Sequence, residues 1–98
     1  NKINMSNKLI YISATWCGPC KLFAPVMNKV GTQVTVEKLD AEIYQGRVKA
    51  GTIQDYGIKS IPTTVKVDAS GKMLDKFVGV KKEAEVLDFY NQQQLFPY

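Results

Sequence analysis

The chain has 98 residues, of which 45% are hydrophobic and 22% are charged; these values are typical of a soluble globular protein and exclude intrinsic disorder. This length suits one domain, so we expect residues 1–98 to form a single domain. The net charge of +4 comes from basic residues that are scattered along the chain without a run. A nucleic-acid surface needs clustered basic residues with interleaved aromatics, and we therefore expect no nucleic-acid partner.

No apolar stretch approaches the length of about 18 residues that a membrane-spanning helix needs. The first eight residues are too polar for the core of a signal peptide. We therefore expect a cytoplasmic protein with no membrane partner, and we expect it to be a monomer.

The first predicted element is a buried strand over Leu9–Ser13, which is an apolar and β-branched run. A helix is predicted from Cys17 onward, because apolar residues then recur at i, i+3, i+4 and i+7 on one helix face. These residues are Phe23, Val26, Met27 and Val30. Pro25 falls inside this helix, where a proline removes one backbone hydrogen bond and usually bends the axis.

The rest of the chain predicts strands, a helical region and a last helix. The strands cover Val34–Leu39, Thr64–Val67 and Met73–Val78, and a hairpin loop at Asp68–Gly71 joins the last two. The last helix covers about Lys82–Gln93 and carries Val86, Leu87 and Tyr90 on its apolar face. Residues 42–55 predict a broken helix or a loop followed by a helix, because Gly46 and Gly51 each cost a helix about 1 kcal/mol relative to alanine. This order predicts an α/β fold with a mixed sheet of about four strands.

The chain contains two cysteines, Cys17 and Cys20, and no histidine. A zinc site needs four ligands, so we expect no metal here. A purely structural disulfide is disfavoured as well, because the loop-entropy model gives only about 2 kcal/mol for a loop of four residues, against about 3 for fifteen. We favour a redox pair, in which one thiolate attacks a substrate disulfide and the second thiol resolves the mixed disulfide.

The predicted elements place Cys17 between the first strand and the first helix. Gly18 and Pro19 suit this turn, since a proline in a first helical turn has no intrahelical partner to lose. Cys17 then meets the free N–H groups and the partial positive charge of the helix N-terminus, which lowers the pKa of a thiol. Cys20 lies one turn further in, and we expect it to be less exposed and to keep a higher pKa.

The segment Ala14–Lys21, which reads ATWCGPCK, closely resembles the active-site motif of the thioredoxin family. Thioredoxin is itself a reference case for the lowered thiol pKa, so only the direction of that shift is expected here. A second segment, Tyr56–Thr64, is similar to the family segment that carries a cis-proline facing the disulfide, and it implies that the Ile61–Pro62 bond is cis. Gly79 matches a family glycine that lets backbone approach the active-site region closely.

The resemblance extends over about residues 8–92 and implies a three-layer sandwich. The first strand-helix pair of the family has little room before Leu9, so we expect most of that pair to be missing. The resemblance also assigns the site residues. It implies Cys17 and Cys20 as catalytic residues, Trp16, Gly18, Pro19, Ile61, Pro62 and Gly79 as the substrate-binding residues, and Lys21, Lys38 and Tyr11 as supporting residues.

Two departures from the family pattern stand out. Thioredoxins commonly carry a buried aspartate six positions before the first cysteine, where it helps to move the proton of the resolving cysteine, and here that position is Tyr11. Lys38 matches a lysine that usually accompanies this acid. Because the acid itself is missing, we expect proton transfer at Cys20 to rely on water, and turnover near neutral pH to be slower or its pH dependence to be shifted. The other departure is the stretch 42–55, longer than the family connection by about five residues, which we expect to be a solvated insertion.

The resemblance implies a thiol-disulfide oxidoreductase that reduces protein disulfides through a reversible Cys17–Cys20 disulfide. It implies no bound cofactor, electrons from an NADPH-dependent flavin reductase (thioredoxin reductase), and substrates such as ribonucleotide reductase. Two alternatives of other kinds stay open: a glutaredoxin-like enzyme that draws electrons from glutathione, and a non-catalytic binding module. A disulfide-forming oxidase or isomerase is disfavoured, because such enzymes usually work in oxidising compartments.

Overall fold

The computed structural model describes residues 7–92, which fold into an alternating α/β arrangement. The elements in chain order are β1 (Lys8–Ser13), α1 (Gly18–Val30), β2 (Val36–Asp40), α2 (Ala41–Ala50), β3 (Thr63–Val67), β4 (Met73–Val78) and α3 (Glu83–Asn91). Each predicted strand is present, with ends within two residues of those expected. Gln93, at the predicted end of the last helix, lies outside the described residues.

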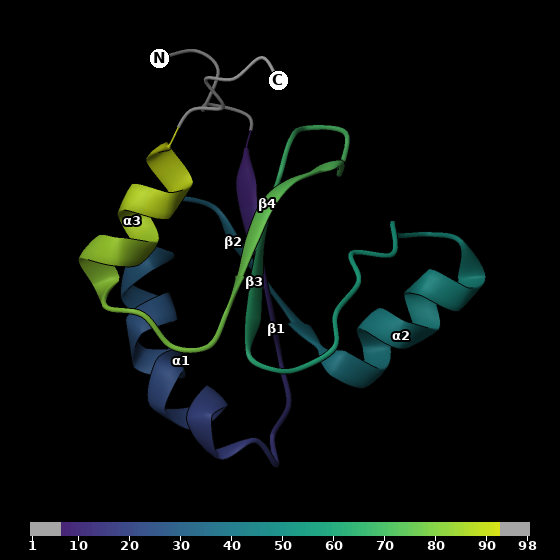
Figure 1. Ribbon diagram of the computed structural model, residues 1–98, viewed down its shortest axis with the longest axis horizontal. Coiled ribbons are helices and arrows are strands. Elements are labelled where there is room, and N and C mark those ends of the chain that lie inside the picture. Colours follow the sequence, from purple (N-terminus) through teal and green to yellow (C-terminus); the bar gives the residue numbers. More distant parts are fainter. Residues whose placement is uncertain (1–6, 93–98) are drawn as a thin grey trace.

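The four strands form one mixed sheet in the order β2-β1-β3-β4. β1 runs parallel to β2, while the pairs β1–β3 and β3–β4 are antiparallel. Helices α1 and α3 cover one face of the sheet and α2 covers the other, as Figure 1 shows. The predicted three-layer α/β sandwich with a four-stranded mixed sheet is therefore confirmed. Within residues 7–92, no strand-helix pair precedes β1.

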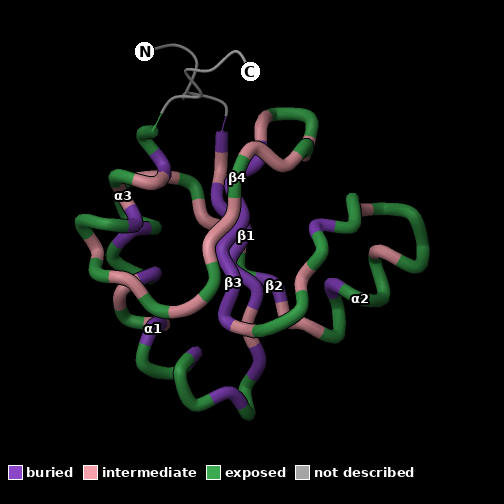
Figure 2. The backbone as a smooth tube through the Cα atoms, viewed as in Figure 1, coloured by how far each residue is buried: buried purple, intermediate pink, exposed green. Residues whose placement is uncertain are grey.

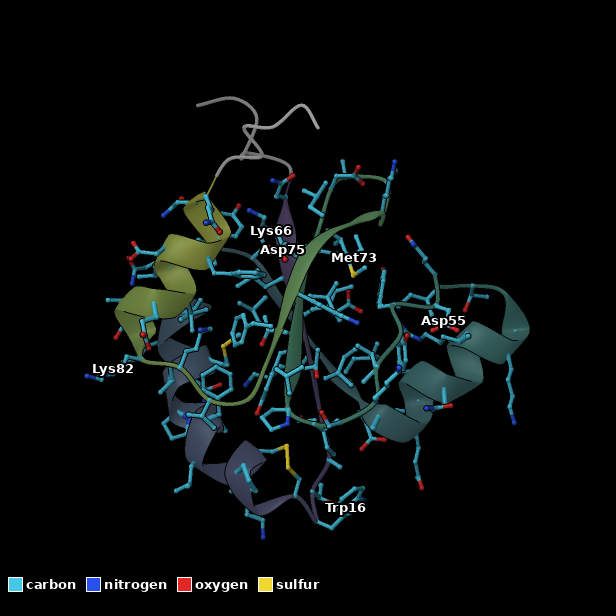
Figure 3. The ribbon with its side chains drawn as sticks, viewed as in Figure 1. Trp16, Asp55, Lys66, Met73, Asp75 and Lys82 are labelled. Carbon is cyan, nitrogen blue, oxygen red and sulfur yellow. A yellow bond between two sulfur atoms is a disulfide. The ribbon has the colours of Figure 1, made fainter. Side chains whose placement is uncertain are left out.

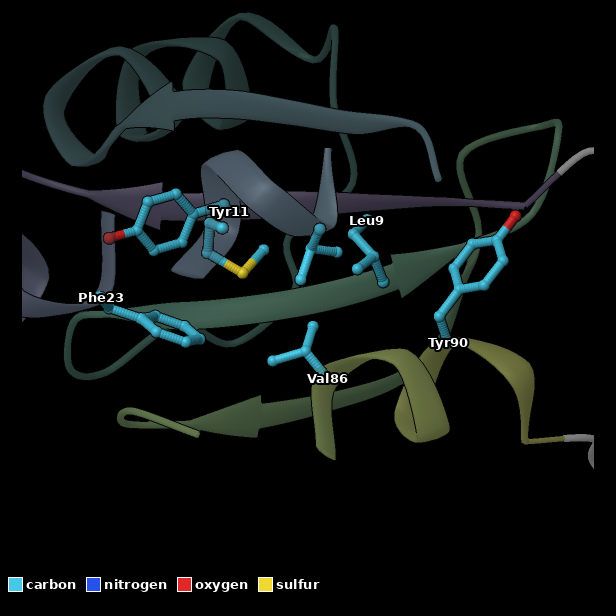
Figure 4. Close-up of a cluster of buried hydrophobic side chains, with 7 residues drawn as sticks. Leu9, Tyr11, Phe23, Val86 and Tyr90 are labelled. Atoms are coloured by element: carbon cyan, nitrogen blue, oxygen red, sulfur yellow. The ribbon is translucent and has the colours of Figure 1, made fainter. Parts of the chain in front are cut away.

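The core consists of two apolar clusters, one on each face of the sheet. Alternate residues of β1 face opposite sides of the sheet. Leu9 and Tyr11 pack beneath α1 and α3, whereas Ile10 and Ile12 pack toward α2. The central strands β1 and β3 are consequently buried almost throughout, as Figure 2 shows. In Figure 4 the hydroxyl of Tyr11 points away from the aliphatic side chains of its cluster, toward the end of the sheet where β1 meets α1.

Helix α2 corrects the prediction for residues 42–55. It runs unbroken from Ala41 to Ala50, through Gly46, and the irregular segment follows the helix. Asp40 caps its N-terminus by accepting hydrogen bonds from Glu42 N and Ile43 N, and Gly51 ends it in the left-handed conformation at φ 76°. These caps offset the cost of about 1 kcal/mol that Gly46 imposes on the exposed side of the helix.

Lys66 is a buried basic residue on the face of β3 that packs beneath α3. Its Nζ donates hydrogen bonds to the carbonyl oxygens of Phe89 (3.1 Å), Tyr90 (3.3 Å) and Gln92 (2.7 Å), which lie at the C-terminal end of α3. Figure 3 shows Lys66 between the sheet and this helix. The ammonium group therefore satisfies carbonyl groups that a helix C-terminus leaves without intrahelical partners. None of the helices within residues 7–92 has the length and apolar character needed to cross a membrane.

Candidate active site

Cys17 and Cys20 form a disulfide at the start of α1, seen as the yellow bond near Trp16 in Figure 3. Their Cα atoms lie 5.2 Å apart, within the range that disulfide geometry requires. Both residues are buried, with exposed fractions of 5% for Cys17 and 3% for Cys20. The expected difference in exposure between the two cysteines has the predicted direction in this oxidised state, but it is small.

Cys17 occupies the N-cap position of α1, as its place between strand and helix predicts. Its backbone is extended, and its sulfur accepts a hydrogen bond from the amide of Cys20 at 3.2 Å. The first turn of α1 contains no acidic residue that would oppose a negative charge on this sulfur. An N-terminal amide and the helix dipole thus both point at Cys17, which favours its thiolate once the disulfide is reduced.

The loop before β3 faces this sulfur. The Ile61–Pro62 bond is cis, in keeping with the resemblance, and the carbonyl oxygen of Ile61 lies 3.9 Å from Cys17 Sγ. The amide of Gly79 donates a hydrogen bond to the carbonyl oxygen of Pro62 at 2.9 Å. Gly79 has a φ of 95°, and a Cβ atom built there meets no atom of the protein within 4 Å. The space above Gly79 is therefore open.

The apolar residues next to Cys17 and Gly79 in the chain are exposed. Trp16 is 73% exposed, Val78 is 60% exposed and Val80 is 48% exposed, although side chains of this kind are usually covered. Gly18, Pro19 and Lys21 are exposed as well, in the first turn of α1. The predicted substrate-binding residues therefore come from three segments, of which residues 61–62 contact both Cys17 and Gly79.

Behind the disulfide lies an open pocket of about 300 Å³ that reaches Cys20. It is lined by Tyr11, Ser13, Ala14, Thr15, Cys20, Lys21, Ala24, Lys38, Leu39 and Asp40. The Tyr11 hydroxyl donates a hydrogen bond to the carbonyl oxygen of Cys20 at 3.0 Å. Burial raises the pKa of Tyr11 above its ordinary value of 10.0, and a hydrogen bond with Ser13 opposes this shift in part. Tyr11 is therefore neutral near pH 7, unlike the carboxylate common at this position in the family.

The three supporting residues meet at this pocket. Lys38 Nζ donates a hydrogen bond to Asn28 Oδ1 on α1, and Lys21 lies on the rim. Ser13 and Asp40 line the same pocket as Tyr11 and Lys38, but they were not among the predicted site residues. The sequence could have indicated both residues, because each ends a parallel strand and the carboxyl ends of parallel strands meet at the same edge of a sheet.

No group of three or more Cys, His, Asp or Glu residues that could hold a metal ion occurs within the described part of the chain.

Comparison with known proteins gives a consistent result. The thioredoxin family model matches residues 1–92. A thioredoxin of Staphylococcus epidermidis is 37% identical over 95 residues, covering 90% of this chain and 86% of the relative. A thioredoxin of Mycolicibacterium smegmatis is 36% identical over 83 residues, covering 81% of this chain and 70% of the relative.

Solved structures agree with the sequence comparisons. A mutant thioredoxin from Halobacterium salinarum superposes with a TM-score of 0.70 at 26% identity, covering 94% of this chain and 80% of that one. Thioredoxin from Malassezia sympodialis gives a TM-score of 0.66 at 27% identity, covering 93% and 79%. Together with the Cys17–Cys20 disulfide at a helix N-terminus, these matches show that the chain belongs to the thioredoxin family and is a thiol-disulfide oxidoreductase.

Proposed function

We propose that this oxidoreductase reduces protein disulfides, with Cys17 as the attacking thiol and Cys20 as the resolving thiol. The observation that carries this assignment is the N-cap position of Cys17, whose sulfur accepts the Cys20 amide hydrogen bond. A thiolate is the nucleophile in disulfide exchange, and a helix N-terminus stabilises a thiolate. Cys20 has no comparable cap and lies at the pocket behind the disulfide, which suits a thiol that acts second.

We further propose that the substrate segment lies in an extended conformation alongside Ile61 and Pro62. The open space at Gly79 admits a neighbouring chain, and the exposed Trp16 and Val78 offer apolar contacts to it. An extended segment beside a loop can use main-chain hydrogen bonds that do not depend on its side chains. This arrangement suits an enzyme that accepts disulfides in different sequence contexts.

The reaction then proceeds by two exchanges. Cys17 attacks one sulfur of the substrate disulfide; that disulfide breaks, and the sulfur that leaves takes up a proton. Cys20 loses its proton and attacks Cys17 Sγ, which breaks the mixed disulfide and releases the second substrate sulfur as a thiol. The substrate gains two electrons and two protons, and the Cys17–Cys20 disulfide is formed.

Membership of the thioredoxin family implies protein disulfides as substrates and thioredoxin reductase as a general partner. Within this frame we propose that an NADPH-dependent flavin reductase restores the dithiol, that no cofactor binds to the chain itself, and that ribonucleotide reductase is one substrate. We also propose that the protein works in the cytoplasm as a monomer.

Reduction of insulin disulfides tests the proposal. The wild-type chain should turn over with NADPH and a thioredoxin reductase, whereas Cys17→Ser and Cys20→Ser should each abolish turnover, and Cys20→Ser should accumulate a mixed disulfide with insulin. Wild-type turnover by either variant would refute the two-cysteine mechanism. Faster turnover with glutathione than with the reductase would favour the glutaredoxin-like alternative. Full biological function of the double serine variant would favour a binding module.

A further inference from the structure

The second exchange requires Cys20 to lose a proton at a place that bulk solvent reaches poorly. Cys20 is 3% exposed, and the thiolate is the attacking species in disulfide exchange. Its proton therefore needs an acceptor that lies on, or is connected to, the pocket behind the disulfide, which Cys20 lines. This requirement rests on the proposed role of Cys20 as the resolving thiol.

The pairing of β1 with β2 brings together four polar residues that line this pocket. Tyr11 pairs with Lys38, and Ser13 pairs with Asp40, in the parallel register of the two strands. Alternate residues of a strand share a face, so Tyr11, Ser13 and Lys38 lie on the face that α1 covers. Asp40 ends β2, where its side chain caps α2 and the residue lines the same pocket. Cys20 and Ala24 of α1 also line this pocket.

Most of the pocket-lining groups cannot accept the proton near neutral pH. Tyr11 is a neutral phenol with a raised pKa, and it already donates its hydrogen to the Cys20 carbonyl oxygen. Lys21 and Lys38 are cations at this pH. Among the described residues that line the pocket, Asp40 alone carries a carboxylate.

Asp40 is also placed to accept a proton without losing its structural role. Its Oδ1 caps α2 by accepting from Glu42 N at 2.8 Å and from Ile43 N at 3.4 Å, and within residues 7–92 Oδ2 accepts no hydrogen bond. The pocket of about 300 Å³ has room for several water molecules, at roughly 30 Å³ each. Water and the Ser13 hydroxyl can therefore connect Cys20 Sγ with Oδ2.

We infer that Asp40 is the proton acceptor for Cys20, acting through water in this pocket. In the resolving step the Cys20 S–H bond breaks and its proton moves through water to Asp40 Oδ2. The Cys20 sulfur then bonds to Cys17 Sγ, and the bond between Cys17 and the substrate sulfur breaks. Asp40 later returns the proton to solvent, and so no further reactant is needed.

The charged groups near Asp40 come from three elements. Lys38 on β2 and Lys21 on α1 are the basic residues that line the pocket with Asp40, and Glu42 lies in the first turn of α2. Tyr11 on β1 contributes a dipole but no charge near neutral pH.

A single-turnover experiment on the full reduced chain separates the two exchanges. The probe is a symmetric aromatic disulfide whose thiolate product is coloured: one equivalent is released when Cys17 attacks, and a second when Cys20 resolves. Asp40→Asn keeps a side-chain oxygen for the helix cap but removes the carboxylate, and Asp40→Ser is a second capping variant. Glu42→Gln is the matched control, since it removes an exposed carboxylate that does not line the pocket.

Both Asp40 variants should slow the second release at least about tenfold near neutral pH, and should make its rate rise in proportion to hydroxide. The first release should stay within about twofold of wild type, and Glu42→Gln should match wild type in both phases. A wild-type second phase with an unchanged pH profile in Asp40→Asn would overturn the inference, and so would equal slowing of both phases. Loss of the first phase in the wild-type chain, or a second phase that persists in Cys20→Ser, would instead refute the proposed function.

Discussion

The amide of Gly79 donates a hydrogen bond to the carbonyl oxygen of Pro62, at 2.9 Å, and thereby fastens the end of β4 to the loop that faces Cys17. Gly79 holds a φ of 95° to make this contact, a conformation that costs an L-residue about 1 to 2 kcal/mol. A side chain here would also enter the open space that we assign to the substrate.

Gly79→Ala should therefore lower the free energy of unfolding by about 1 to 2 kcal/mol and should also reduce the rate of insulin reduction. Gly71→Ala is a matched control, because Gly71 has a φ of 89°, has equally open space and lies in the β3–β4 turn. The control should lose similar stability in urea unfolding and keep wild-type turnover. Equal activity losses in both variants would contradict a substrate contact at Gly79.

Lys66 links β3 to the C-terminal end of α3 through three carbonyl oxygens. Lys66→Met should destabilise the chain by about 2 to 3 kcal/mol, because three hydrogen bonds from a charged donor to the end of α3 are lost. Lys49→Met, at an exposed position of α2, should change stability by less than about 0.5 kcal/mol. Urea unfolding of both variants checks this prediction, and equal stability of the two variants would contradict it.

Much of the fold could be predicted because its signals are local. The apolar run before the cysteines, the helical spacing after them and the Asp68–Gly71 turn each specify one element, and the structure has each of them. The predicted break in the helical region 42–55 was wrong, because helix propensity counts the cost of Gly46 but not the caps supplied by Asp40 and Gly51.

Contacts between distant segments were less accessible from the sequence. In the sequence, Lys66 occupies a polar position between apolar residues of a strand, which predicts an exposed side chain. Its burial results from the packing of α3. In the same way, the redox pair and the cis-proline followed from motifs, whereas the link from Cys20 to Ser13 and Asp40 depends on the register between β1 and β2. That register brings together residues far apart in the chain.

Stability should fall at alkaline pH because four tyrosines are buried. Burial raises the pKa of Tyr11, Tyr44, Tyr56 and Tyr90 above 10.0. The folded state then binds more protons than the unfolded state above about pH 10, so each tyrosine contributes stability that is complete below pH 10 and is lost as pH rises through its folded pKa. Each contributes a slope of up to about 1.4 kcal/mol per pH unit in its window.

Burial lowers the pKa of Lys66, and this shift makes the free energy of unfolding rise with pH, but it concerns one residue against four tyrosines. Urea unfolding of the oxidised chain from about pH 8 to about pH 11 measures the net effect, and keeping the disulfide intact removes thiol titration from the result. A Tyr56→Phe variant should show a shallower fall with pH. A free energy of unfolding that stays constant or increases above pH 10 would contradict this account.

The most direct test of the account is the thiol pKa of Cys17 in the reduced chain, measured as the pH dependence of its alkylation rate in Cys20→Ser. This variant keeps the backbone amide that points at the Cys17 sulfur and leaves one thiol to titrate. The helix N-terminus predicts a midpoint clearly below the value of about 8.5 for a free cysteine. A midpoint at or above that value would contradict the assignment of Cys17 as the activated nucleophile.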